Sequence, residues 1–476
     1  MKKTLMLISV LLLAFTIAAC NSDKEIDDRI VITYASWNLG TPESKETNME
    51  RLMIDAFMEV NPNIKVNIIE RPKLPGTNDD MSWNEFLAAR ASTQTLPDVI
   101  QSDNIPLYVI NNWAYNITEI AEADPEYANI STDISGVVNY GGKIMAIPNA
   151  VFYAGYVINK TLYELQGQNA PTLTSTYAEF MALTKAAADH SSTTNTGVVG
   201  LEGIEHIIHW YPAQVNNNYG WFTLSDNGFN LDSDAFGQAI TEYRKLATDS
   251  TFVYEAFVSA SQEEDSTLSL ADAFQFPFVE TGTILAKYHY SWDFGWYQTM
   301  MEGEDFTSEL DFIGIPVVNG NKKVPIVADF FTLASNTKNP EAAYEFAKWM
   351  GFGKDGYLKR IELSNTVEGI AKVNFAPIQN DEDLLDAYFA LYPGFPGLRT
   401  IIENGSFIVE PVKYLPGYDD ARYRGTYNAE FKMGQVVTQL LTGGVQYADV
   451  KVPLNTQANL LFNQAKQAFD AALATK

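Results

Sequence analysis

Two short groups of residues have the side-chain types and spacing that metal ions use. His206 and His209 stand three positions apart, where one helix face could present both rings. Asp232 and Asp234 resemble the start of a calcium loop, but the glycine and glutamate that such a loop carries further on are missing. With four histidines and one cysteine in the chain, we predict no metal ion and no other cofactor, although the sequence alone leaves calcium open. We expect Asp232 to Asp234 to cap a helix over 235–247.

Motifs for covalent or phosphate chemistry are missing from the sequence. There is no Gly-x-Ser-x-Gly elbow and no phosphate-binding loop. Adjacent acidic residues such as Glu263 and Glu264 are typical of a solvated surface. The sequence therefore offers no motif that would identify a catalytic residue.

The single cysteine, Cys20, ends an amino-terminal segment that has the features of a bacterial export signal. Lys2 and Lys3 precede an apolar run over 5–15, and small residues lead into the cysteine. This arrangement resembles a lipobox, at which a lipoprotein is cut and lipidated. We predict a lipoprotein signal peptide over 1–20 with Cys20 as the lipidation site. The alternative is an ordinary signal peptide with an incidental cysteine.

The residues after the leader indicate a tethered, extracytoplasmic protein. The run over 5–15 is shorter than the roughly 20 apolar residues that a membrane span needs, and no later segment comes close. Residues 21–29 are polar and charged, so we expect a flexible tether there. Membrane contact would then occur through the N-terminal lipid only.

Size and charge limit the remaining possibilities. About 450 residues after the leader exceed one ordinary core, so two domains are expected. The net charge of −27 repels nucleic acid and anionic headgroups, so we expect neither as a partner. The same charge disfavours a polyanionic solute, unless basic residues such as Arg71 or Lys143 act locally.

The first third of the chain alternates between strand and helix patterns. Strands are expected at 30–35, 64–70 and 96–100, and helices at 49–60 and 83–91. Repeated βαβ units predict an α/β fold with a parallel sheet. Ligands of such sheets bind beyond the carboxyl ends of the strands. The loops at 36–38 and 101–104 are therefore the first places to expect binding residues.

Six short pieces of the chain resemble one family in their order and spacing. The family is the extracellular solute-binding proteins of ABC importers, in particular the group that includes maltose-binding protein and other sugar-binding lipoproteins. The pieces are Phe57 to Val66 (F-x-x-x-x-P-x-I-x-V), Leu96 to Ile100, Gly141 to Pro148 with Ile158 to Lys160, Gly282 to Trp292, Phe312 to Pro316, and Ser335 to Phe346. In the last piece, Asn339 is expected to cap a helix that starts at Pro340 and ends before Gly351.

The resemblance implies a two-lobe periplasmic-binding-protein fold of type II. Its ligand cleft would lie between two α/β lobes that crossing strands join. We place one lobe at 30–148 and 328–378 and the other at 149–327 and 379–476, with a third crossing at 373–377. The segment 392–424, rich in Pro, Gly and Tyr, looks like an insertion that borders the cleft.

The family's cleft segments supply the candidate ligand-binding residues. Aromatic rings can stack on the apolar faces of sugar rings, and carboxylates and amides pair with hydroxyls. The candidates are Trp37, Asp103, Asn149, Tyr153, Trp210, Trp221, Trp292, Asp293, Trp296, Asp329 and Phe331. The aromatic candidates could instead be core residues, and the aspartates could be helix caps. Family members often carry two glycines where this chain has Ala328 and Asp329, which weakens a direct transfer of ligand identity.

Together these features predict a lipid-anchored, monomeric binding protein on the extracytoplasmic face of the cell membrane. It would capture a carbohydrate, most simply an oligosaccharide, and deliver it to the transmembrane subunits of an ABC permease. The anchor favours a bacterium with a single membrane. The alternative is a surface-anchored glycoside hydrolase, which needs two carboxyl groups on opposite sides of the scissile bond.

Overall fold

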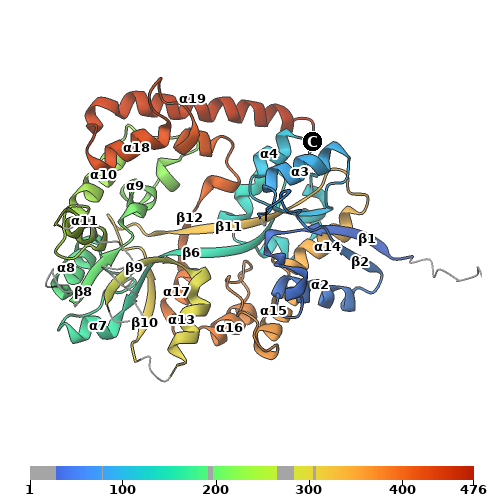
Figure 1. Cartoon of the computed structure of the whole chain (residues 1–476), viewed down its shortest axis with the longest axis horizontal. Helices are drawn as coiled ribbons and strands as arrows, with labels where there is room; N and C mark the ends of the chain where they lie inside the picture. Colours follow the sequence, from blue (N-terminus) through green and yellow to red (C-terminus); the bar gives the residue numbers. More distant parts are fainter. Residues whose placement is uncertain (1–27, 78, 191–196, 265–282, 304–306) are drawn as a thin grey trace, which may run out of the picture.

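The computed structural model describes residues 28–77, 79–190, 197–264, 283–303 and 307–476. These residues form two α/β lobes (Figure 1), which confirms the predicted fold class. Strands of both lobes join one sheet in the order β2-β1-β3-β11-β6-β9-β8-β7, which ends at β7 (Asp189–His190), with β10 paired to β6 and β12 paired to β11. Cys20 and the predicted leader 1–20 lie outside the described residues, as does most of the predicted tether.

The first lobe begins with the βαβ units that the sequence predicts. The strands are β1 (Ile30–Ala35), β2 (Ile64–Ile68) and β3 (Val99–Ser102), and the helices are α2 (Met49–Val60) and α3 (Trp83–Ser92). β1 pairs in parallel with β2 and with β3. The buried face of α2 includes Met53 and Phe57, as its helical apolar pattern requires.

Two long strands cross from one lobe to the other. β6 (Ile147–Asn159) and β11 (Lys323–Leu333) pair antiparallel, with a register shift between Asp329 and Phe330. β11 pairs with β3 in the first lobe, while β6 pairs with β9 in the second. All 13 residues of β6 are buried, as expected for a strand covered on both faces. These two strands contain the first two predicted crossings, whereas the exact lobe boundaries remain predictions.

The second lobe builds its sheet from β8 (Gly197–Glu202), β9 (Ile284–Tyr290) and β10 (Leu310–Gly314). β10 approaches β6 so closely that a Cβ on Gly155 would lie 2.5 Å from the backbone of Gly314. Helices α9 (Ile207–Val215), α10 (Asp234–Leu246) and α11 (Tyr254–Glu264) follow or flank these strands. The helix expected at 235–247 is therefore confirmed within one residue, and the side chain of Ser233 provides its cap by accepting from Phe236 N at 3.3 Å.

The last third of the chain returns to both lobes. α14 (Pro340–Met350) and α15 (Lys354–Thr366) pack against α2, and α16 (Glu382–Leu391) packs against α15. α14 starts and ends as predicted, but the side chain of Asn339 makes no capping bond and donates to Val31 O at 3.4 Å. α17 (Pro396–Asn404) packs against β10 of the second lobe, and β12 (Ser406–Val409) follows it.

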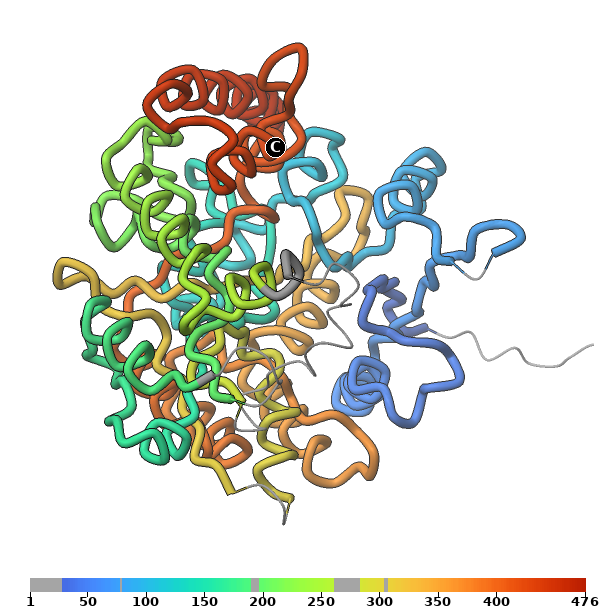
Figure 2. The backbone as a smooth tube through the Cα atoms, turned by 60° about the vertical axis from the view of Figure 1, so that its left-hand side comes forward, coloured from blue at the N-terminus to red at the C-terminus, as the bar shows by residue number. Residues whose placement is uncertain are grey.

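The long helix α19 (Tyr447–Leu473) extends along both lobes. It contacts the turn η9 (Asp420–Arg424) in the second lobe and α4 (Ile105–Ile110) in the first. In Figure 1 it lies above the crossing strands, whereas α13 (Phe294–Met301) and α15 lie below them; Figure 2 shows the same helix beside α18 (Met433–Thr442) in red. Over the described part of the chain, no helix combines the length and apolarity needed to cross a membrane.

Candidate functional site

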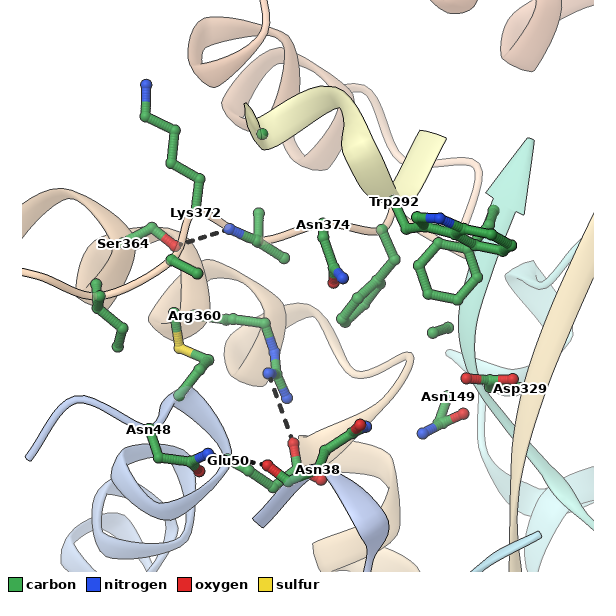
Figure 3. A pocket seen from close by; sticks show the side chains of 18 of the residues that line it. Asn38, Asn48, Glu50, Asn149, Trp292, Asp329, Arg360, Ser364, Lys372 and Asn374 are labelled. Atoms are coloured by element: carbon green, nitrogen blue, oxygen red, sulfur yellow. Dashed lines mark hydrogen bonds and ion pairs between the residues drawn. The ribbon is translucent and has the colours of Figure 1, made fainter. Parts of the chain in front are cut away.

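A cavity of about 670 Å³ opens between the two lobes. Its walls come from the segment after β1, from the start of α2, from the crossing strands and from the turn η7 (Ser291–Asp293) with α13. Residues 370–375, which include part of the predicted third crossing, close one side. Figure 3 shows Trp292 on the far side of this cavity from Asn48 and Glu50.

The first-lobe wall is built from fixed polar groups. Asn38 N donates to Ser36 Oγ at 3.0 Å, which starts the short turn after β1. The amide of Asn48 donates to Asn38 O at 2.9 Å, while its carbonyl oxygen caps α2 by accepting from Arg51 N. The segment between β1 and α2 thus holds the Asn48 side chain in place before any ligand binds.

The carboxylates of the cavity are both paired with cations. Glu50 is buried, accepts from the hydroxyl of Tyr34, and lies 3.8 Å from Nη1 of Arg360. Asp329 on β11 forms an ion pair with Lys413. The charges at the site are therefore largely balanced within the protein.

Two buried amides at the base of the cavity have atoms without partners. Gln101 Oε1 accepts from Ser36 Oγ, but Gln101 Nε2 has no hydrogen-bond partner among the described residues. Asn149 Oδ1 on β6 is in the same situation. Such a buried polar atom costs about 1–3 kcal/mol, so this donor and this acceptor are suited to a polar ligand.

An aromatic wall faces these amides. Trp292 and Trp296 are 37% and 48% exposed. The indole of Trp292 stacks on Tyr290 with ring centroids 4.1 Å apart and planes 5° apart, and Phe152 meets it edge-on. A ring that is packed on one face and exposed on the other is preorganised for stacking a flat apolar surface.

The structure brings four of the eleven candidate residues to the cavity, namely Asn149, Trp292, Trp296 and Asp329. Two candidates lie near it. Trp37 precedes the lining residue Asn38 and meets Trp83 edge-on at 5.4 Å. Asp103 accepts from the hydroxyl of Tyr108 at 2.7 Å.

The remaining candidates do not line this cavity. Tyr153, Trp210 and Phe331 are buried in the lobe cores. Asp293 Oδ2 lies 2.9 Å from Nδ1 of His289. Trp221 is buried and stacks on His209 with centroids 5.1 Å apart.

Several lining residues have no counterpart among the predicted candidates. Asn38 and Gln101 lie in the segments 36–38 and 101–104, where binding residues were expected after predicted strands, although the structure places Gln101 on β3. Glu50 and Arg360 carry no comparable signal, because each reaches the cavity only through the packing of α2 and α15.

The suspected metal ligands do not form a metal centre. His206 ends a short turn and stacks on Tyr288, whereas His209 lies on α9. Within the described ranges, no group of three or more His, Cys, Asp or Glu side chains is arranged to hold a metal ion.

The two-lobe fold and the cleft between the lobes define a class of protein, and the sequence comparison gives the family. The family of bacterial extracellular solute-binding proteins matches residues 41–352, more than half of the chain. The chain belongs to this family. No curated protein sequence gives a match.

Solved structures of low sequence identity share the fold. An ABC substrate-binding protein from Listeria monocytogenes in complex with cycloalternan has 17% identity and a TM-score of 0.61, covering 91% of this chain and 98% of its own. A sugar transporter protein from Rhizobium etli in an open conformation has 14% identity and a TM-score of 0.66, with coverages of 90% and 99%. The sugar-binding protein MalE from Xanthomonas citri has 13% identity and a TM-score of 0.64, with coverages of 92% and 99%.

Proposed function

We propose that this protein captures a carbohydrate, specifically an oligosaccharide, in the cleft between its lobes and delivers it to an ABC permease. The observation that carries the proposal is the exposed indole pair Trp292 and Trp296 opposite two unpartnered amide atoms, Gln101 Nε2 and Asn149 Oδ1. Sugar rings offer this pair of surfaces, because their C–H faces are apolar and their hydroxyls both donate and accept.

The size and the surroundings of the site support this ligand class. A cavity of about 670 Å³ lies within the range of small-molecule sites and can take more than one sugar ring. Among proteins of the same fold, the one from Listeria monocytogenes holds cycloalternan, and the one from Xanthomonas citri is sugar-binding. In this chain, we propose that Asn149, Trp292, Trp296 and Asp329 contact the sugar.

The hydrolase alternative is less well supported by the cavity. A glycoside hydrolase needs one carboxyl group that stays protonated near neutral pH, which an apolar environment without a cation provides. Glu50 and Asp329 are the lining carboxylates, and each has a cation beside it. This arrangement suits hydrogen bonding to hydroxyls and is unsuited to acid catalysis.

A thermal-shift screen with an oligosaccharide panel tests the proposal. We expect at least one saccharide to raise the melting temperature, since a ligand that binds only the folded state stabilises it. The same mixtures are then analysed for cleavage products. Stabilisation without cleavage products supports a binding protein, whereas cleavage supports the hydrolase. If no saccharide in the panel raises the melting temperature, the proposal that the ligand is a carbohydrate is contradicted.

We also propose that Cys20 carries a lipid that holds the protein at the extracytoplasmic face. The sequence 16–20 supports this proposal, because small residues lead into the only cysteine. The variant Cys20→Ala should no longer be found in the membrane fraction, because we propose the lipid on Cys20 as the group that holds the protein there. If the variant stays in the membrane fraction after an alkaline wash, the anchor proposal is wrong.

A further inference from the structure

The base of the cleft holds one hydrogen-bond donor and one acceptor that the protein itself leaves unused. Gln101 and Asn149 line the cavity and are 0% and 6% exposed. Among the described residues, neither Gln101 Nε2 nor Asn149 Oδ1 has a hydrogen-bond partner. A buried polar atom without a partner is costly, so the chemistry of these two atoms indicates which ligand group the site accepts.

The first lobe fixes the orientation of the Gln101 amide. Ser36 Oγ accepts from Asn38 N at 3.0 Å and donates its own proton to Gln101 Oε1. The oxygen of the Gln101 amide is therefore already bonded, and the nitrogen is the half that stays available. Because an amide nitrogen only donates, this position of the cavity calls for an acceptor on the ligand.

An irregularity of the sheet presents Asn149 to the cavity. Along β6 and β11, Pro148 is opposite Phe330 and Ala150 is opposite Asp329, so Asn149 is the extra residue of a β-bulge. Bulges re-aim side chains and are frequent beside ligand sites. Figure 3 shows the Asn149 side chain in the cavity that Asp329 also lines. Since Asn149 Oδ1 only accepts, this position calls for a donor on the ligand.

The two unpartnered atoms come from strands on either side of β11. In the sheet, β11 lies between β3, which carries Gln101, and β6, which carries Asn149. Strands two places apart in a sheet are separated by about 10 Å. The two amides leave each other unbonded, so one ligand group between them can accept from Gln101 and donate to Asn149.

The charges of the cavity favour a neutral ligand group. Each ionised side chain that lines the cavity has a group of opposite charge beside it. The pairs are Glu50 with Arg360 at 3.8 Å, Lys372 with Glu302 at 2.8 Å, and Asp329 with Lys413. A charged ligand group would therefore lose its hydration without meeting an unpaired counter-charge, which makes a carboxylate or an ammonium group unfavourable there.

Buried apolar side chains line the same cavity, namely Ala150, Phe152, Met350, Val373 and Phe375. An acetamido group matches this combination, because it has one carbonyl acceptor, one N–H donor and a methyl group. A pair of hydroxyls also offers a donor and an acceptor. Its remaining O–H and lone pairs, however, would need further partners among apolar side chains.

We propose that the bound saccharide contains an N-acetylated amino sugar, whose acetamido carbonyl accepts from Gln101 Nε2 and whose N–H donates to Asn149 Oδ1. The inference rests on the proposed binding of an oligosaccharide and adds a chemical class to it. The ring that bears the acetamido group stacks on Trp292, whose exposed indole belongs to the same cavity.

Isothermal titration of the full-length protein with matched saccharides tests the inference. Each pair has the same linkage and length and differs only in hydroxyl or acetamido groups. The pairs are cellotetraose with tetra-N-acetylchitotetraose, lactose with N-acetyllactosamine, and galactose with N-acetylgalactosamine. We expect at least one acetamido probe to bind about tenfold to a hundredfold more tightly than its hydroxyl partner, as for two additional hydrogen bonds. Deacetylated chitotetraose, which carries ammonium groups, should bind no more tightly than cellotetraose.

Two variants assign the preference to the two amides. Gln101→Met keeps the length of the side chain but removes the donor, and Asn149→Ala removes the acceptor. Each should lower the affinity ratio of the preferred pair by about tenfold, since one of the two hydrogen bonds is lost. A purely structural role would instead weaken both members of the pair equally. The matched control is Gln467→Met at an exposed position of α19, which should keep the ratio.

The possible results separate this inference from the proposed function. If no acetamido probe binds more tightly than its hydroxyl partner, the acetamido inference is overturned, and this result does not depend on whether the variants fold. A preference that survives unchanged in folded Gln101→Met and Asn149→Ala variants also overturns it. Binding of any hydroxyl saccharide leaves the proposed function intact, whereas failure of every saccharide in these titrations and in the thermal-shift panel contradicts it.

Discussion

Asn149 combines a buried position with a carbonyl oxygen that has no partner in the described part of the chain. Burial without a partner lowers the stability of the free protein, and a ligand hydroxyl that donates to this oxygen recovers the loss. The same reasoning applies to Nε2 of Gln101. The base of the cleft is therefore more stable with a polar ligand than without one.

Replacement of Asn149 should separate binding from stability. Asn149→Ala should weaken saccharide binding by about tenfold, since one buried hydrogen bond is lost. The free energy of unfolding without ligand should not fall, because an unsatisfied buried oxygen is removed. Titration calorimetry and urea denaturation measure the two effects. The exposed Asn404→Ala should change neither, and a large loss of stability in Asn149→Ala would show that the amide is structural instead.

At the residue scale, the candidates that reach the cavity are among those that the family resemblance placed on its cleft segments. Trp292 follows β9, Asn149 and Asp329 lie on the crossing strands, and these residues reach the cavity. Arg360 could not be predicted, because it meets Glu50 only after α15 has packed on α2. Trp210 shows the opposite problem, since composition does not distinguish a core tryptophan from a ligand contact.

At the scale of elements, local patterns predict the first lobe closely. β1 and α2 have the predicted ends, because apolar periodicity is a local signal and so is the Asn61-Pro62 pair, which disfavours continuation of the helix. β2 is assigned two residues less than expected, although Ile69 N still donates to Tyr34 O at 2.8 Å. The position of α19 along both lobes could not be predicted from local patterns, because tertiary contacts determine it.

The contact between α11 and the loop after β8 is sensitive to pH. Glu255 Oε1 accepts from Gly203 N at 2.6 Å and from Ile204 N at 3.2 Å. Burial, with the nearby Glu205 carboxyl, raises the pKa of Glu255 from its ordinary 4.5 to about 7. The folded state therefore holds this proton more tightly than the unfolded state does.

Because the pKa of Glu255 is raised in the folded state, this carboxyl should make the protein less stable as pH rises. As pH rises from 4.5 to about 7, the unfolded state releases the Glu255 proton first, so this carboxyl lowers the free energy of unfolding across that window and has no further effect above it. Glu255→Gln should remove the contribution. Urea denaturation of both proteins between pH 4 and pH 8 measures the difference, and parallel curves for wild type and variant would refute the assignment.

At the scale of the whole molecule, α19 lies above the crossing strands in Figure 1, whereas α13 and α15, which line the cavity, lie below them. α19 is fixed to the first lobe by Lys143 Nζ, which donates to Leu473 O at 2.8 Å, and by Phe469, which packs on Tyr140 with centroids 4.8 Å apart. We therefore expect the lobes to move about the side that carries α19 and to open or close the cavity on the other side.

Ligand binding should make the molecule more compact. A saccharide that touches Gln101 in the first lobe and Trp292 beside the second favours the closed state by its greater affinity for that state. Small-angle X-ray scattering should give a smaller radius of gyration at saturating ligand than without ligand. A radius that does not change at saturation would indicate a rigid binding module.

The central claim is that a saccharide binds against Trp292 in the cleft between the lobes. Its most direct test is the affinity of Trp292→Ala for the saccharide found by the thermal-shift screen, measured by titration calorimetry beside the melting temperature without ligand. We predict a loss of about 2–4 kcal/mol, or 30-fold or more in affinity, with a nearly unchanged melting temperature. The half-buried Trp113→Ala, outside the cavity, serves as the control and should retain its affinity. Full affinity in a folded Trp292→Ala variant, or a collapse of its melting temperature, would contradict the claim.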